Sequence, residues 1–191
     1  AGIATTGQGP EKTITLRPAD AVQWALYYPA VLARKSDRQP VESIGDDGNA
    51  LIEHASQLLA VGRHDEATRA LDQVLAENPS DSRANALKAI IALVQNNTRT
   101  ALEFAHRATD SPAPAAAAWL AQSYVEQARF WIADARDSAR RATHVAPEDA
   151  LAWARVAELE LANGQLDAAR QAASTAVDLD PQLAKTHTVL G

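Results

Sequence analysis

The sequence predicts an all-α fold: an α-α superhelix of about four stacked helix-turn-helix repeats that follows an N-terminal capping segment. Three observations predict it. Small residues recur at a spacing of 34, glycines mark the same point in two of the units, and prolines end three of them. Several independent columns that share one period do not arise from alanine richness alone, so we interpret the chain as a repeat array.

The alanine columns predict how the helices pack. One column is alanine in every unit and a second is leucine once and alanine elsewhere: Ala67, Ala101, Ala135 and Ala169, then Leu71, Ala105, Ala139 and Ala173. Small side chains let two helix backbones approach closely, while larger neighbours fill the remaining gaps. We therefore expect the two helices of a unit to pack closely, with the first helix of the next unit lying against them.

Glycine and proline predict where the helices end. Gly62 and Gly164 can adopt the positive φ that ends the first helix of a unit. Pro79, Pro147 and Pro181 stop the second helix, because a continued helix would need the N–H that proline lacks. Each unit is thus predicted to be two helices with a glycine turn between them and a proline turn after them.

A period of 34 with two helical stretches per unit resembles the tetratricopeptide repeat, and the resemblance covers residues 48–183. It implies a right-handed superhelical domain over residues 48–191. The implied repeats are 48–81, 82–115, 116–149 and 150–183, with the start of a fifth at 184–191. The resemblance also implies a role in binding other proteins.

The second unit departs most from the family pattern. Asn85 stands where a large apolar residue is expected, Lys88 falls at a usual leucine position, and the closing proline is displaced to Pro112. The register of the first helix in this unit is therefore the hardest to place from the sequence.

Residues 1–47 are different in character. "TITL", 13–16, alternates like a short strand, and a helix is predicted from Pro18 with a break at Pro29. This stretch carries an apolar surface that includes Trp24, Tyr27, Tyr28 and Leu32. Exposed aromatic surface of this kind needs cover. The segment either caps the first repeat or, as a rival hypothesis, residues 20–34 dock into the groove of a second copy of the chain.

The N-terminal segment carries a second resemblance. "LRPADAVQWALYYPAVL", followed by repeats that contain "AIIALVQNN" and "QSYVEQARF", is similar to bacterial proteins in which a FecR-type domain precedes a tetratricopeptide array. The resemblance implies a FecR-type domain upstream of Ala1 and a periplasmic or cell-envelope location. Because the chain begins with alanine and ends within a repeat pattern, we expect it to be a piece of a longer protein.

Composition argues against several classes of function. A formal net charge of −6 is unfavourable for nucleic-acid binding, no apolar run is long enough to span a membrane, and no cysteine is present for thiolate chemistry. The five histidines lack metal-site spacing or a neighbouring nucleophile motif, so we predict no enzyme activity, no metal and no cofactor. His54, at an inward-pointing helix position, is interpreted as a hydrogen-bonded, partly buried residue.

A binding role is better supported by the repeat pattern. The first helices of stacked units line the concave face of a superhelix, and the repeat register predicts that a peptide-binding groove is formed by Asn49, Ile52, Ser56, Arg83, Ile90, Leu120, Tyr124, Gln127, Glu158 and Leu161. Several of these side chains, the leucines above all, equally fit an inter-helix core.

The predicted groove is largely apolar. Some family members grip acidic tails with Lys and Asn at positions that hold residues such as Ile52 and Leu120 here, so an amphipathic helix or an extended apolar segment fits better. The sequence therefore predicts a non-catalytic scaffold that binds a protein or peptide. The alternative is an accessory or assembly subunit of an envelope enzyme or export complex whose active part lies outside this chain.

Overall fold

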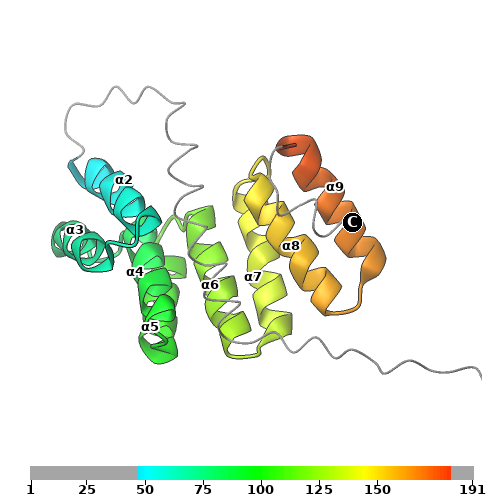
Figure 1. Ribbon diagram of the computed structural model, residues 1–191, viewed down its shortest axis with the longest axis horizontal. Helices are drawn as coiled ribbons and strands as arrows, with labels where there is room; N and C mark the ends of the chain where they lie inside the picture. The colour runs from blue at the N-terminus through cyan, green and yellow to red at the C-terminus, as the bar shows by residue number, and fades with distance from the viewer. Residues whose placement is uncertain (1–46, 182–191) are drawn as a thin grey trace, which may run out of the picture.

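The computed structural model describes residues 47–181. The predicted strand at 13–16, the apolar segment at 20–34 and the fifth repeat at 184–191 lie outside the described residues. Within the described range the chain forms eight α-helices and no strand. Figure 1 shows them as a row of helical hairpins that runs from α2 at one end to α9 at the other. The predicted all-α repeat fold is confirmed.

Each unit consists of an A helix followed by a B helix. The A helices are α2 (Asp47–Ala60), α4 (Ser82–Val94), α6 (Ala116–Ala128) and α8 (Ala150–Ala162). The B helices are α3 (His64–Glu77), α5 (Thr98–Thr109), α7 (Ile132–Val145) and α9 (Leu166–Leu179). The B helices begin at residues 64, 98, 132 and 166, so successive B helices start 34 residues apart.

Every turn from an A helix to a B helix contains a residue with positive φ. Gly62 and Gly164 have φ of 79° and 74°, as the sequence predicts. The second and third units reach the same conformation without glycine, at Asn96 (φ 59°) and Phe130 (φ 63°). Asparagine tolerates this region, whereas a bulky aromatic residue is strained there. The turn geometry is therefore common to all four units although the residue is not.

The second unit replaces an aromatic residue by asparagine and keeps its hydrogen bond. Asn85, only 1% exposed, donates from Nδ2 to the carbonyl oxygen of Pro79 at 3.0 Å. Trp153, at the same position of the fourth unit, donates from Nε1 to the carbonyl oxygen of Pro147 at 2.8 Å. Since Pro79 and Pro147 are themselves equivalent, the two side chains anchor the A helix to the preceding turn in the same way.

The displaced proline of the second unit shortens its B helix. α5 has 12 residues, whereas α7 has 14, and the connection at 110–115 is longer to match. Ser82, at the start of α4, holds this connection in place. Its hydroxyl donates to the carbonyl oxygen of Ala108 at 2.9 Å and accepts from the N–H of Ala115 at 3.0 Å.

The small residues let the helices approach as predicted. The four alanines at the invariant position are almost fully buried: Ala67, Ala101, Ala135 and Ala169. Neighbouring units are not packed equally, however. α4 lies against α6 over an extensive contact that buries Ala86, Ala121 and other small side chains, whereas α2 touches α4, and α6 touches α8, at only a few residues. The two central units therefore form the most continuous part of the array.

The junctions between units are numbered by the helices that meet: α3 and α4 at junction one, α5 and α6 at junction two, α7 and α8 at junction three. The same B-helix position faces each junction, occupied by Asp72, His106 and Arg140. Asp72 pairs with Lys88 at 2.6 Å, and Arg140 pairs with Glu160 at 2.5 Å. The first and third junctions are thus bridged by ion pairs of opposite polarity.

Candidate functional site

The helix-A face is the side of the array formed by α2, α4, α6 and α8, and all ten predicted groove residues belong to these four helices. Six of them are buried, among them four core side chains that are at most 4% exposed: Ile52, Ile90, Leu120 and Tyr124. The expectation that these four side chains form an exposed apolar groove is therefore corrected. An A helix such as α4 contacts α3, α5 and α6, so little of its circumference is left for solvent.

The other two buried residues are polar. The Ser56 hydroxyl donates to the carbonyl oxygen of Ile52 in its own helix at 3.0 Å. Gln127 is 8% exposed near the end of α6. His54, expected to be partly buried, is instead exposed on α2. The helix-A face therefore combines buried apolar side chains with polar ones, and two of the polar ones, Ser56 and Gln127, are themselves buried.

At the α2–α4 end of the face, polar side chains link two units. Arg83 donates from Nη1 to Oδ1 of Asn49 at 3.1 Å, and its Nη2 lies 2.5 Å from Oε1 of Glu53. Asn49 and Arg83 occupy the same repeat position in successive units. The Arg83 side chain is 40% exposed, so its guanidinium reaches solvent as well as its two partners.

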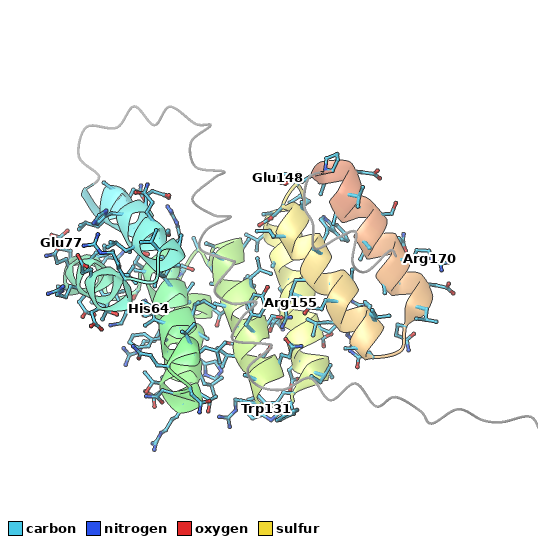
Figure 2. The ribbon with its side chains drawn as sticks, in the orientation of Figure 1. His64, Glu77, Trp131, Glu148, Arg155 and Arg170 are labelled. Carbon is cyan, nitrogen blue, oxygen red and sulfur yellow. The ribbon has the colours of Figure 1, made fainter. Side chains whose placement is uncertain are left out.

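At the α6–α8 end, a buried arginine links the third and fourth units. Arg155 is 1% exposed, and its guanidinium stacks on the ring of Tyr124 with Cζ 4.0 Å from the centroid. It donates to the hydroxyl of Ser123 at 3.0 Å and to Oε2 of Glu158 at 3.0 Å. Figure 2 labels Arg155 on α8, in the part of the array beside α6. Tyr124 and Glu158, two predicted groove residues, are brought together by this side chain.

Arg155 was not predicted as a site residue. The signal in the sequence is a single arginine within the apolar stretch of α8, at a position that is Ala121 in the third unit and Leu87 in the second. A buried guanidinium needs hydrogen-bond acceptors, and Ser123 and Glu158 supply them. The last predicted groove residue, Leu161, is 44% exposed at the end of the same helix.

Junction two contains a buried carboxyl group with few partners. Glu126 is 7% exposed, accepts from Nε2 of Gln122 at 2.7 Å, and has its Oε2 buried without a hydrogen bond. Burial raises the pKa of Glu126, and the hydrogen bond from Gln122 offsets only part of that rise. Its equivalent in the next unit, Glu160, is paired with Arg140.

Two further features were sought over residues 47–181. No group of three or more His, Cys, Asp or Glu side chains in this range is arranged to hold a metal ion. None of the helices in the described part of the chain is both long and apolar enough to cross a membrane.

Comparison with known families places the chain. Two family models described as tetratricopeptide repeat match residues 58–123 and 120–184. Together they span more than half of the sequence, so the chain belongs to the tetratricopeptide repeat family. The sequence matched none of the curated proteins with which it was compared.

Solved structures with the same fold are distant in sequence. The thermophilic TPR protein TTC0263 from Thermus thermophilus has a TM-score of 0.64 and 16% identity, and the match covers 90% of this chain and 96% of that one. Pseudomonas aeruginosa pilF has a TM-score of 0.66 and 16% identity, with 75% of this chain and 65% of that one covered. YrrB, described as a TPR protein with an unusual peptide-binding site, has a TM-score of 0.55 and 18% identity, with 76% and 75% covered. At these identities the likeness shows the fold alone.

Proposed function

We propose that the protein is a non-catalytic interaction scaffold and that its helix-A face binds a peptide or protein segment. One observation carries the proposal: the A helices α2, α4 and α8 carry partly exposed charged side chains as well as buried apolar ones. Glu53 and Arg83 lie at one end of this face, and Glu158 at the other. Stacked helix pairs present such a face as one continuous surface.

The chemistry of the face indicates how a segment would be held. The Arg83 guanidinium can donate to a backbone carbonyl or carboxylate of the ligand, and Glu158, itself held by Arg155, can accept from a ligand N–H. Leu161 adds an exposed apolar contact beside Glu158. The solved neighbour with a described peptide-binding site supports a peptide as the ligand.

The test is selection of binders from a peptide library displayed on phage, with the full chain as bait. Selected peptides should bind Arg83→Ala and Glu158→Ala about tenfold more weakly, because a hydrogen-bonded charged anchor is lost. Arg170→Ala and Glu77→Ala remove exposed charges from B helices (Figure 2) and should leave affinity unchanged. Peptides that lose affinity only with the two B-helix variants would contradict the proposal.

We also propose a periplasmic or envelope location, which is supported by the resemblance of the N-terminal segment to FecR-associated bacterial proteins. If the chain is an accessory subunit of an envelope complex whose active part lies elsewhere, the helix-A face is the surface that binds the other subunits. Fractionation of cells that express the complete gene tests the location. Recovery of the protein only with cytoplasmic markers would contradict it.

A further inference from the structure

A second surface lies away from the helix-A face, at junction one. A cleft of about 410 Å³ opens between α3, α4 and α5, and we name it the junction-one cleft. Ile91 and Phe104 form its apolar wall, while Arg69 and Lys88 contribute positive charge. Because two of its three helices are B helices, it is distinct from the proposed peptide face and independent of that proposal.

The repeat pattern explains why this junction leaves a cleft open. Ala92 lines the cleft, and the equivalent residues in the next two units are Glu126 and Glu160. Both glutamate residues are buried at their junctions, at 7% and 1% exposure. Junctions two and three therefore contain a carboxylate from the chain itself, whereas junction one has a methyl group and leaves the space open.

A second position widens the same space. Thr68 lines the cleft from α3, and the equivalent residue in α5 is the larger Leu102. At both positions, junction one therefore has a smaller residue than the equivalent position of the next unit. The space that remains is large enough for a side chain or a small ligand.

The charges around the cleft are suited to a carboxylate. Lys88 is 13% exposed in its side chain, with Nζ 5.2 Å from the centre of the Phe104 ring and 2.6 Å from Oδ1 of Asp72. Arg69 makes no ion pair with any residue that the structure describes. Asp65 also lines the cleft and Asp72 is 57% exposed, so both acidic groups can remain in water while a ligand carboxylate approaches the two cations.

We propose that the junction-one cleft binds the carboxylate of an aspartate or glutamate side chain from an acidic segment of a partner protein. The ligand carboxylate takes the place that the chain's own Glu126 and Glu160 fill at the other two junctions. Lys88 and Arg69 donate to it, in the role that Arg140 has toward Glu160. Phe104 and Ile91 contact the aliphatic part of the ligand side chain.

The experiment measures binding of a labelled hexaglutamate peptide to the full chain by fluorescence anisotropy, with hexaglutamine as the neutral control. Ala92→Glu is the central variant, because glutamate at this position is already accommodated in two other units. It should fill the cleft and weaken hexaglutamate binding about tenfold or more, while circular dichroism shows the helical fold retained. Ala92→Gln fills the same volume without the charge and should weaken binding less than Ala92→Glu.

Two charge variants sharpen the result. Lys88→Gln copies Gln122 of the next unit and should weaken binding about fivefold, whereas Asp72→Asn removes the competing carboxylate and should strengthen it about threefold. Arg170→Gln removes one positive charge far from the cleft and should leave affinity unchanged. If Ala92→Glu does not fold, these three variants decide the question.

Three results would overturn the proposal. Equal weakening by Lys88→Gln and Arg170→Gln would indicate non-specific charge attraction. Unchanged affinity in Ala92→Glu and Lys88→Gln would place the peptide elsewhere. Saturable binding of free glutarate without binding of hexaglutamate would assign the cleft to a small carboxylate and not to a protein partner.

Discussion

Junctions one and three are built from the same repeat positions, yet they differ in polarity and in burial. At junction one the B helix supplies the acid, Asp72, whose side chain is 57% exposed, and its partner Lys88 is 13% exposed. At junction three the B helix supplies the base, Arg140, and its partner Glu160 has a side chain only 2% exposed. The comparison teaches that neighbouring units can be bridged by an ion pair of either polarity. In both bridges the partner on the A helix, Lys88 or Glu160, is the more buried of the two.

The largest expected effect comes from breaking the bridge at junction three. Arg140→Ala leaves the buried Glu160 carboxylate without its cation, and we expect the free energy of unfolding to fall by about 3 kcal/mol. Lys88→Ala at junction one leaves Asp72 in water and should lower it by less than about 1 kcal/mol. Urea denaturation of both variants measures the difference. Equal losses would show that burial of Glu160 does not distinguish the two junctions.

A second comparison concerns the turns of the third and fourth units. Phe130 has the positive φ that Gly164 has in the next unit, and it is 67% exposed, so little packing offsets the strain. Phe130→Gly should raise the free energy of unfolding by about 1 kcal/mol, and Gly164→Phe should lower it by a similar amount. Thermal denaturation checks both. A loss of stability in Phe130→Gly would mean that the exposed ring contributes contacts that outweigh the strain.

Junction two can be converted into a copy of junction three. His106 stands where junction three has Arg140, and Glu126 stands where it has Glu160. His106→Arg should therefore supply the missing cation and raise the free energy of unfolding by about 0.7 kcal/mol near neutral pH. The same substitution made in Glu126→Gln should give no gain. A gain of equal size in both backgrounds would show that the arginine acts on something other than Glu126.

The smallest effect is the pH dependence contributed by Glu126. Because burial raises the pKa of Glu126, the folded protein binds this proton more tightly than the unfolded chain does. Its contribution to stability is therefore favourable at low pH and is lost as the pH rises from about 4.3 through the raised pKa. Between about pH 4 and about pH 7, the wild type should lose stability relative to Glu126→Gln. Parallel curves for the two proteins would contradict this prediction.

Much of the fold could be predicted because the small residues required where helices pack recur every 34 residues in the sequence. Alanine columns and prolines located the units, and Gly62 and Gly164 marked two of the four turns. The other two turns were not predicted, because asparagine and phenylalanine, the residue types of Asn96 and Phe130, do not by themselves indicate a positive φ. The backbone conformation there is imposed by the helices on either side and not by the residue itself.

The candidate site was less predictable. The sequence could not decide whether Ile90 or Leu120 faces solvent, because an A helix is apolar on several sides and contacts three neighbours. Arg155 was missed for a related reason. Its acceptors, Ser123 and Glu158, come from two helices, so their convergence depends on the α6–α8 contact and not on local sequence.

The broad contact between α4 and α6 has a mechanical consequence. The α4–α6 contact is broad, whereas the α2–α4 and α6–α8 contacts are small. We therefore expect the array to be stiff at its centre and more flexible toward its two ends. Amide protons of α5 and α6 should accordingly exchange with deuterium most slowly, and those of α3 and α9 sooner. If the proposed peptide binds along the helix-A face, we expect the two ends of the array to move toward it while the centre keeps its shape.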